Sequence, residues 1–341
     1  MSSGALNLAV IGAGRIGKLH AENIATRVSG ARLAGVADIN LVAAQAVAQR
    51  FHVTLATDDY RTLLDNPAVD AVVVCSATDT HVRIIEEAAA HGKHILCEKP
   101  IGLDVPKVRA AIAAAETARV KLQVGFNRRF DPSFARVREL VASGQIGEPH
   151  IIRITSRDPA PPPLDYVKVS GGIFLDMTIH DFDMVRFLSG SDAEEIYAIG
   201  DALVDPAIAH AGDVDTAIVT MRLKNGALAT IDNSRKAVYG YDQRVEVFGS
   251  AGMATVSNRT PDNHILANAD GVHTAKPQYF FLDRYQESYI AELQAFVACV
   301  LNDQTPSVSG ADGLMPVILG FAATKSLKER RPVKVSEIGG A

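Results

Sequence analysis

The sequence predicts an α/β protein of two domains: residues 1–125, in which strands and helices alternate around a parallel sheet, and residues 126–341, in which helices cover an antiparallel sheet. Three observations support this fold class. A glycine-rich turn follows the first apolar segment, strand-like and helix-like segments then alternate to residue 124, and alternating strand patterns joined by a hairpin signal fill much of the second half. The 341 residues, 48% hydrophobic and 21% charged, suit about two globular domains.

The N-terminal segment carries a dinucleotide-binding pattern. Residues 6–11 form an apolar strand-like run, and Gly12, Gly14 and Gly17 follow it at the start of a helical segment. In this pattern the glycines tighten the turn, let the backbone approach a pyrophosphate and allow close packing of helix on strand, with the phosphate at the helix N-terminus. The glycines alone are weak evidence, because a tight turn without a ligand shares their spacing.

A carboxylate at the end of the next predicted strand strengthens this prediction. Residues 31–37 form that strand, and Asp38 follows it about 20 residues beyond the last glycine, where a carboxylate accepts hydrogen bonds from the adenine ribose hydroxyls. The same carboxylate would repel a 2′-phosphate, and Ile39 and Asn40 supply no cation to hold one. The sequence therefore predicts NAD as the cofactor in preference to NADP.

The remaining segments of the first domain continue this alternation. A continuous apolar run at 69–75 suits a strand that is buried on both faces of a parallel sheet. Ligands of such sheets bind at the carboxyl ends of the strands. The predicted helices are 41–50, 59–64 and 104–118, and the predicted strands are 53–56, 69–75, 95–97 and 121–124.

Polar side chains follow two strands at this edge of the sheet. His81 comes after the first of them, and a structural role at the start of the next helix is favoured over catalysis for it. Lys99 comes after strand 95–97 and stands between Glu98 and Pro100. An ammonium group at this edge can stabilise the alkoxide that develops when a hydroxyl is oxidised. Lys99 is therefore a candidate for electrostatic catalysis.

Residues 171–188 predict a largely buried helix with one polar face. Asp176, His180 and Asp183 are spaced i, i+4 and i+7, which places them on the same side of a helix among apolar neighbours. Ionisable groups on a buried helix are expected to be paired with another group or to take part in binding or catalysis. For an isolated Asp/His pair, a satisfied core histidine is the favoured interpretation. The dinucleotide pattern and Lys99 shift the balance toward catalysis, with His180 as general base.

The second half predicts a sheet covered by helices on one face. Asn225-Gly226 lies between two alternating segments and is the best hairpin signal in the sequence. The uncovered face would expose Ile, Val, Thr and Ala, which predicts a homo-oligomer. The predicted helices are 131–143, 171–188, 283–299 and 311–328, and the predicted strands are 147–154, 196–203, 216–223, 227–231, 244–248 and 253–256.

Composition excludes several classes of partner. The formal net charge of −5, without a basic run that contains aromatic residues, argues against nucleic acid. The N-terminus has no basic region before its short apolar run, and no apolar stretch approaches the length of a membrane span, so no membrane partner is expected. Cys75, Cys97 and Cys299 are odd in number, widely spaced and surrounded by apolar residues, which predicts a cytoplasmic protein without disulfides or a metal site.

Taken together, these motifs resemble the Gfo/Idh/MocA oxidoreductase family over nearly the whole chain. The motifs are GAGRIG, the strand end at Asp38, SATDTH, CEKP, VGFNRRF, IGEP, GGIFLDMTIHDFD and YGYD. CEKP together with the Asp176/His180 segment is specific to that family, and residues 125–183 with 239–242 look most like its inositol 2-dehydrogenase branch. The resemblance implies an N-terminal NAD-binding Rossmann domain, residues 1–125, and a C-terminal substrate-binding and oligomerisation α/β domain with a large open antiparallel sheet, residues 126–341. It also implies a homotetramer.

The resemblance also implies the residues of the site. Lys99, Asp176 and His180 would form the catalytic set. The sequence departs from the branch at Ser156, where the branch carries histidine, and in the proline run 159–163, which leaves the exact polyol open. By resemblance the cofactor would contact Gly12, Gly14, Arg15, Ile16, Gly17, Asp38, Ser76, Thr78, His81, Glu98, Lys99 and Asn127, and Arg129, Asp158, Asp183 and Tyr241 would join the catalytic set around the substrate.

The activity implied is NAD-dependent oxidation of a ring hydroxyl of a cyclic polyol, with myo-inositol and its 2-keto product as the first choice. His180 would take the hydroxyl proton, Lys99 would stabilise the alkoxide in place of a metal, and Asp176 would orient the imidazole. The alternatives are another cyclitol, a pyranose sugar or an anhydrosugar, because fold does not fix the substrate. A non-catalytic regulator that senses dinucleotides is less favoured, since it would not need all three side chains.

Overall fold

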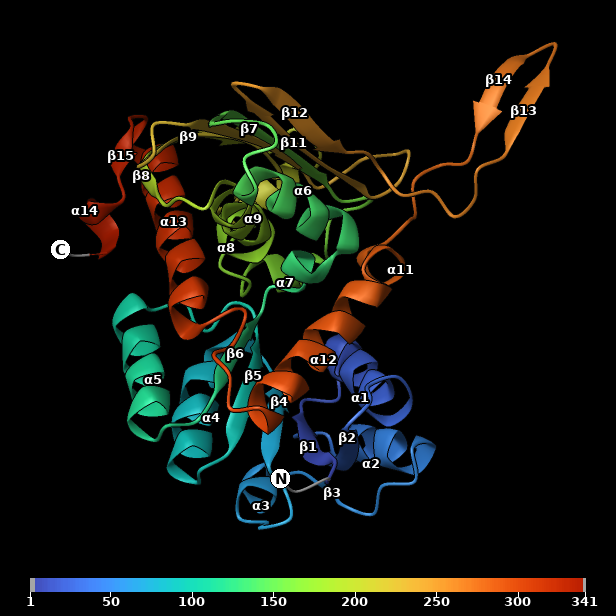
Figure 1. Ribbon diagram of the computed structural model, residues 1–341, viewed down its shortest axis with the longest axis vertical. Coiled ribbons are helices and arrows are strands. Elements are labelled where there is room, and N and C mark those ends of the chain that lie inside the picture. The colour runs from blue at the N-terminus through green and yellow to red at the C-terminus, as the bar shows by residue number, and fades with distance from the viewer. Residues whose placement is uncertain (1–3, 340–341) are drawn as a thin grey trace. The chain divides into compact units, whose positions relative to one another are not determined.

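The computed structural model describes residues 4–339, which form two compact units. The first unit contains the chain up to Asn127 together with Glu287–Val317, and the second contains Arg128–Gln286 together with the chain from Ile318 onward. Figure 1 follows the chain by residue number. This division differs from the sequence-based one because residues 287–317 return to the first unit, where Leu293, Phe296 and Val297 pack into the hydrophobic core.

The first unit is built on a six-stranded parallel sheet. Its order is β3-β2-β1-β4-β5-β6, which is the order of a dinucleotide-binding Rossmann fold. The residues of β4 are buried throughout, as the apolar run of this segment predicted. The strands are β1 (Leu6–Ile11), β2 (Ala31–Ala37), β3 (Ala56–Thr57), β4 (Ala71–Val74), β5 (His94–Glu98) and β6 (Leu122–Gly125).

Helices cover both faces of this sheet. Figure 1 shows α4 (Thr78–Ala90) and α5 (Val105–Thr117) on one side of the sheet, and α1 (Arg15–Thr26) and α2 (Leu41–Arg50) on the other. The long α12 (Gln286–Leu301) packs into the same hydrophobic core as α1 and α2. The first unit also contains the short α3 (Arg61–Leu64).

The second unit is built on a seven-stranded sheet in the order β12-β11-β7-β10-β9-β8-β15. The predicted hairpin is confirmed, since β9 and β10 pair antiparallel on either side of Asn225-Gly226. The predicted antiparallel sheet is corrected to a mixed sheet, because β7 and β10 pair parallel. The strands are β7 (Pro149–Arg157), β8 (Ala193–Asp201), β9 (Thr216–Leu223), β10 (Leu228–Ser234), β11 (Asp242–Gly249), β12 (Gly252–Val256) and β15 (Val333–Lys334).

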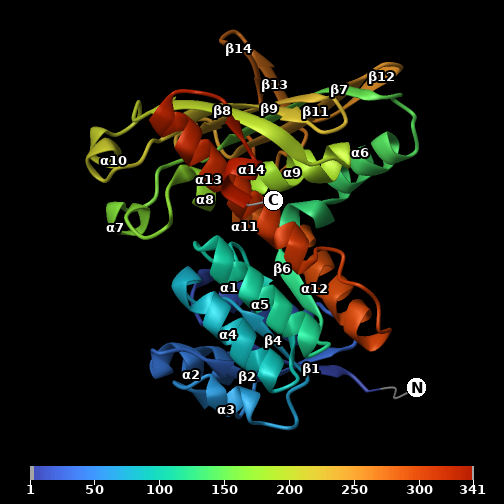
Figure 2. The ribbon, with the colours of Figure 1, turned by 90° about the vertical axis from the view of Figure 1, so that its left-hand side faces the viewer.

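Helices lie on one face of this second sheet, as Figure 2 shows for α6, α9 and α13. Alternate residues of β9 are buried, which matches a sheet with one covered face. The helices of the second unit are α6 (Pro132–Ala142), α7 (Leu164–Val167), α8 (Ile173–Asp176), α9 (Ile179–Ser189), α10 (Pro206–His210), α11 (Phe281–Arg284) and α14 (Ser336–Gly339), and α13 (Gly310–Glu329) joins it from Ile318.

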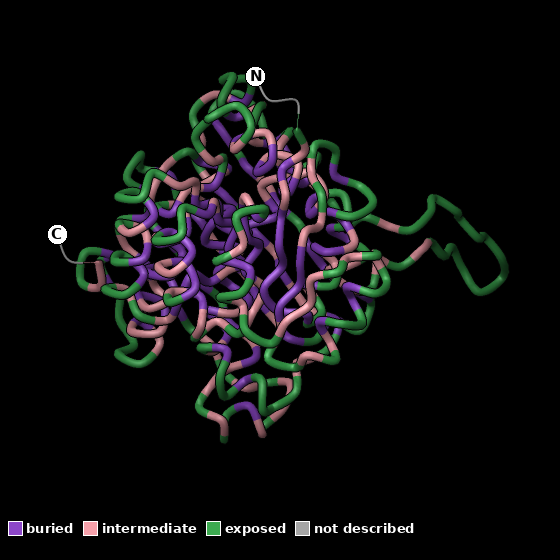
Figure 3. Tube along the Cα trace, turned by 90° about the horizontal axis from the view of Figure 1, so that it is seen from below, coloured by how far each residue is buried: buried purple, intermediate pink, exposed green. Residues whose placement is uncertain are grey.

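Several local features were not predicted. The predicted strand 53–56 is the two-residue β3, and the predicted helix 283–299 is divided at Tyr285 into α11 and α12. A hairpin of β13 (Ile265–Asn268) and β14 (Gly271–Thr274) is exposed along its whole length (Figure 3). Among the described residues, no helix combines the length and the hydropathy that a membrane span requires.

Candidate active site

The glycine turn of the first unit has the geometry of a phosphate cradle. Gly12 has φ +102°, and a Cβ there would lie 2.6 Å from the backbone carbonyl of Cys75. A Cβ on Gly17 would lie 1.8 Å from the oxygen of Gly12, so both positions require glycine. Gly14 caps α1 in an extended conformation with open space around it, so the first N–H groups of α1 can bind an anion. Arg15 and Ile16 begin this helix.

Asp38 stands beside this turn at the end of β2. Its carboxylate accepts a hydrogen bond from the Ala13 N–H at 2.6 Å and one from the Asn40 N–H at 2.8 Å. A carboxylate has about four lone-pair sites, so capacity remains for two ribose hydroxyls. The next residue, Ile39, is 96% exposed and has no charge that could hold a 2′-phosphate. The residues of the turn and Asp38 therefore fit NAD.

The turn after β4 is tied to the turn after β5. His81 is buried, and its ring nitrogens lie 2.8 Å from the Pro100 carbonyl oxygen and 3.0 Å from that of Ser76. Burial lowers the pKa of His81. Ser76 Oγ bonds Thr80 Oγ1 at 2.6 Å, and Thr78 is the half-buried first residue of α4. His81 thus supports the loops of the sheet edge through both ring nitrogens, in agreement with the structural role predicted for it.

Glu98 and Lys99 stand at the carboxyl end of β5. Glu98 is 9% exposed, Lys99 is half-buried, and the Lys99-Pro100 peptide bond is cis. Asn127, just beyond β6, is buried, and its Nδ2 has no hydrogen-bond partner within the described part of the chain. A buried amide donor of this kind is available to a ligand.

Sequence reasoning missed a buried polar group behind Glu98. His20 Nε2 lies 2.7 Å from Glu98 Oε1, and the ligand atoms of His20, Glu98 and Glu292 all lie within 4.8 Å of one another. Among the described residues, this group alone has the spacing of a metal site. Burial and the nearby Glu98 raise the pKa of Glu292 well above its usual range. The raised pKa favours the neutral form of Glu292, which lowers the negative charge of this buried group.

In the second unit, the structure corrects the predicted helix 171–188. The segment forms two helices, α8 and α9, which are separated at Met177 and Thr178. Thr178 Oγ1 donates a hydrogen bond to Asn233 Oδ1 at 2.6 Å and so ties the break to β10. Asp176 therefore ends α8 and His180 is the second residue of α9, so Asp176, His180 and Asp183 do not belong to one uninterrupted helix.

Asp176 is held at both carboxylate oxygens. Tyr166 Oη donates to Asp176 Oδ1 at 2.8 Å, and Arg235 Nη1 donates to Asp176 Oδ2 at 2.9 Å. Neither donor was predicted, because Tyr166 comes from α7 and Arg235 follows β10, and nothing in the local sequence links either residue to α8. His180 is half-buried at the start of α9.

Asp158 lies near Arg235, and Tyr241 contacts Arg128. Asp158 Oδ2 is 3.9 Å from Arg235 Nη1, and the Asp158 side chain is 27% exposed. Burial, reinforced by the charge of Asp176, raises the pKa of Asp158 to about 6. Tyr241 is buried, and its hydroxyl accepts a hydrogen bond from Arg128 Nη2 at 3.4 Å. The pKa of Asp158 is therefore raised toward neutral pH, and the charges around this carboxyl decide its protonation.

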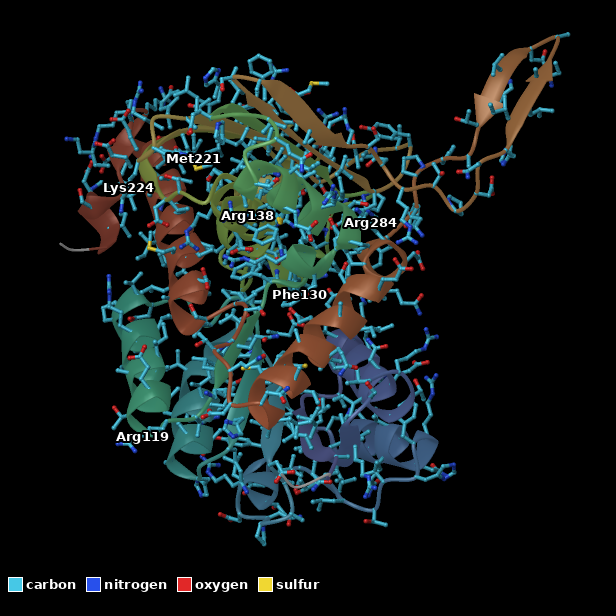
Figure 4. The ribbon with its side chains drawn as sticks, in the orientation of Figure 1. Arg119, Phe130, Arg138, Met221, Lys224 and Arg284 are labelled. Carbon is cyan, nitrogen blue, oxygen red and sulfur yellow. The ribbon has the colours of Figure 1, made fainter. Side chains whose placement is uncertain are left out.

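Two further arginines are paired with aspartates on α9. Arg129 donates three hydrogen bonds to Asp183, the shortest at 2.6 Å, and Asp183 is 1% exposed. Arg128 Nη1 donates to Asp181 Oδ1 at 2.6 Å, and neither side chain is more than 6% exposed. Both carboxylate oxygens of Asp183, which was expected near the substrate, thus accept hydrogen bonds from Arg129. In Figure 4, Arg284 is labelled on α11, from which it pairs with Asp131 at the start of α6.

The structure brings the predicted residues together in two sets. The first unit holds the glycine turn, Asp38 and Lys99, and the second unit holds Asp176, His180 and the paired arginines. A parallel sheet in this strand order with a phosphate cradle and a ribose carboxylate defines an oxidoreductase of the NAD-binding Rossmann class.

Comparison with known proteins then gives the family. The chain belongs to the Gfo/Idh/MocA oxidoreductase family: residues 6–126 match its NAD-binding Rossmann model, and residues 134–255 match its C-terminal domain model. The resemblance, the fold class and the NAD-binding unit predicted from the sequence are thereby confirmed.

Related proteins match over nearly their whole length. The chain is 49% identical to myo-inositol 2-dehydrogenase of Thermotoga maritima, covering 98% of this chain and 100% of that protein. It is 45% identical to inositol 2-dehydrogenase of Rhizobium meliloti, covering 96% and 98%. Among solved structures, scyllo-inositol dehydrogenase of Lactobacillus casei with NAD(H) and scyllo-inositol superposes with a TM-score of 0.92 at 31% identity, covering 97% and 99%.

Proposed function

We propose that this protein oxidises a secondary ring hydroxyl of a cyclic polyol, myo-inositol foremost, to the ketone with NAD. The observation that carries the proposal is the pairing of charges in the second unit. Arg128, Arg129 and Arg235 each donate to an aspartate, so their charges are already offset within the protein. An anionic substrate would instead favour arginines that are left to bind it. This mixture of donors and acceptors suits a neutral substrate rich in hydroxyls.

The relatives support the same substrate class. The relatives from Thermotoga maritima and Rhizobium meliloti are named as inositol 2-dehydrogenases and match this chain nearly end to end. A second candidate, scyllo-inositol, is favoured by a relative named scyllo-inositol 2-dehydrogenase (NAD(+)), which is 36% identical over 96% of this chain.

The mechanism assigns one role to each of three side chains. His180 accepts the proton of the hydroxyl, since a neutral imidazole is a base suited to neutral pH. Lys99 donates to the same oxygen and stabilises the developing alkoxide. Asp176, fixed by Tyr166 and Arg235, accepts a hydrogen bond from the imidazole or from the neighbouring hydroxyl. Lys99 belongs to the first unit and the other two to the second, so their meeting at one substrate is part of the proposal.

The cofactor set is also proposed from these observations. Bound NAD supplies the acceptor for the hydride. Gly12, Gly14 and Gly17 leave room for the pyrophosphate, and Asp38 accepts from the ribose. The proposed set also includes Arg15, Ile16, Ser76, Thr78, His81, Glu98 and Asn127, with Arg129, Asp158, Asp183 and Tyr241 on the substrate side.

Growth of NADH absorbance with a substrate panel tests the activity. The panel contains myo-inositol, scyllo-inositol, glucose and 1,5-anhydroglucitol, each with NAD and with NADP. We expect the highest kcat/KM with myo-inositol and NAD. A higher value with scyllo-inositol selects the second candidate, and ten-fold preference for NADP would refute the role of Asp38. No turnover with any compound would favour the dinucleotide-sensing regulator.

The proposal also includes a homotetramer formed through the uncovered sheet face. Met253, Phe248, Ile151 and Leu228 are successive partners across four neighbouring strands, and three of them are 44–58% exposed. A row of this kind marks a protein interface. Light scattering at micromolar concentration should give four copies, and Phe248→Lys should give a smaller species. A monomeric wild type would refute this part.

A cytoplasmic location is proposed on the cysteines. Cys75, Cys97 and Cys299 are all free, and burial raises the pKa of the Cys97 thiol well above its usual range. Thiols of this kind persist in a reducing compartment. Recovery of the activity from the periplasmic or secreted fraction of its host would contradict this location.

A further inference from the structure

Arg235 is a buried arginine that stands between two carboxylates of the proposed substrate site. It is 2% exposed, and its Nη1 lies 2.9 Å from Asp176 Oδ2 and 3.9 Å from Asp158 Oδ2. Its backbone N–H donates to the Asp215 carbonyl oxygen at 2.8 Å, which fixes the start of the side chain. The Nε and Nη2 atoms of Arg235 have no hydrogen-bond partner among residues 4–339. The guanidinium of Arg235 is thus buried, and the side chains that it pairs with are carboxylates.

The charges around Arg235 show what it offsets. Asp213 is a third nearby acid, and its Oδ1 accepts from the Ile173 N–H at 3.0 Å at the start of α8. Two carboxylates close together cannot both ionise readily unless a cation lies between them. The charged groups that act on Asp158 are Arg235 and Arg128, which favour its ionised form, and Asp176 and Asp181, which oppose it.

We propose that Arg235 is a positioning residue of the reaction: its guanidinium keeps Asp176 and Asp158 ionised and oriented, so that both accept hydrogen bonds from neighbouring hydroxyls of the polyol. The planar guanidinium suits this task, since it presents several donors in fixed directions. The inference rests on the proposed function, but neither the resemblance nor the sequence pattern assigns Arg235 any role. This role also explains why a buried arginine stands directly after the last residue of β10.

The test compares Arg235→Met with Arg235→Lys. Rates are measured with myo-inositol and NAD from pH 5 to 9. We expect Arg235→Met to lower kcat/KM by about 30-fold, since the charge-assisted contact that orients Asp176 is lost. Removing the positive charge raises the pKa of Asp158, so the acid limb of the profile should move up by about one pH unit. Arg235→Lys keeps the charge, so its kcat/KM should be at least about five-fold higher than that of Arg235→Met.

A double-mutant cycle with Asp158→Asn separates charge from packing. If Arg235 acts by offsetting the carboxylates, Asp158→Asn should cost less in the Arg235→Met background than in the wild type, because it removes one of two repelling charges. Arg136→Met is the matched control, since Arg136 pairs with Glu139 on the surface of α6 at 61% exposure and should leave the rate unchanged. NADH binding followed by fluorescence and the Tm report whether each variant is folded. If Arg235→Met does not fold, the cycle is run on Arg235→Gln, which also removes the positive charge.

The outcomes separate this inference from the function on which it rests. A wild type that oxidises no polyol overturns both. An active wild type with Arg235→Met within two-fold of its kcat/KM and an unmoved acid limb overturns this inference alone. A lower Tm with an unmoved acid limb and additive effects in the cycle shows a purely structural arginine, which also refutes it.

Discussion

Buried carboxyl groups are handled differently in the two units. In the second unit, Asp181 and Asp183 are buried and each receives an arginine at 2.6 Å. In the first unit, Glu98 is paired with the His20 imidazole at 2.7 Å, and both oxygens of Glu292 lack a hydrogen-bond partner among the residues that the structure describes.

The difference teaches how each group is kept from destabilising the fold. An arginine is always charged, so a carboxylate paired with it stays ionised and fixed in direction. A carboxyl buried beside another carboxyl becomes neutral by keeping its proton. The second unit thus keeps its aspartates ionised where a polar substrate is proposed to bind. The first unit keeps Glu292 neutral inside the core between α1, β5 and α12.

The largest expected effect comes from breaking an arginine pair in the second unit. Arg128→Met leaves the Asp181 charge buried and unpaired at 0% exposure, which should cost about 3–5 kcal/mol of unfolding free energy. Urea unfolding followed by circular dichroism measures this loss. Arg136→Met, which breaks a surface pair, should change stability by less than about 1 kcal/mol.

The double variant Arg128→Met/Asp181→Leu sharpens the same point. Replacing both partners with apolar groups removes the unpaired charge and should recover most of the loss. Failure to recover it would show that packing of Arg128 on the Tyr285 ring, 5.5 Å away, carries the effect instead.

The next largest effect tests whether the two units act on one alcohol. Lys99→Met in the first unit and His180→Ala or Asp176→Asn in the second should each lower kcat at least about 10²-fold, with NAD affinity little changed. Stopped-flow or steady-state NADH formation gives kcat, and fluorescence titration gives the affinity. A variant that keeps more than half of the wild-type kcat removes that residue from the mechanism.

Local sequence signals account for most of the fold but for less of the site. Segments 6–11, 41–50 and 216–223 were predicted with the observed bounds, since strand and helix periods are local properties. The break between α8 and α9 was missed because it depends on Thr178 bonding Asn233, 55 residues away in sequence. No glycine or proline marks it.

The partners of the site residues could not be predicted for the same reason. Lys99, Asp176 and His180 are recognisable from neighbouring residues in the sequence, whereas the roles of Arg235 and Glu292 depend on residues that the fold brings close. The sequence shows an arginine after a strand and a glutamate within the apolar α12, but it does not indicate which residues they contact.

A smaller effect is expected from the first unit. Glu292→Gln replaces a protonated carboxyl by a neutral amide of the same shape, so unfolding free energy at pH 7 should change by less than about 1 kcal/mol or increase. Asp181→Asn is the matched control: the same chemical change leaves Arg128 buried and unpaired, and about 3 kcal/mol should be lost. Equal losses would refute the contrast between the units.

The stability of Glu292→Gln relative to the wild type should depend on pH, and the direction follows from the raised pKa of Glu292. The folded pKa of Glu292 lies well above the usual 4.5, so the folded protein keeps a proton that the unfolded chain releases. The contribution of this group is fully present below pH 4.5 and is lost as pH rises through the folded pKa, with a slope of up to about 1.4 kcal/mol per pH unit. The difference in stability between wild type and Glu292→Gln should follow this slope, and a flat difference would mean that Glu292 is ionised in the folded state.

The smallest effect is expected at Tyr166, on the exposed side of Asp176. Its hydroxyl donates to Asp176 Oδ1 at 2.8 Å, but the residue is 48% exposed, so water can replace the hydroxyl in Tyr166→Phe. We expect kcat to fall by no more than about five-fold, about 1 kcal/mol, with an unchanged acid limb. The buried Arg235 on the other oxygen of Asp176 has no such replacement. A loss of 10²-fold in Tyr166→Phe would therefore reverse their order and make the tyrosine, not the arginine, the group that fixes Asp176.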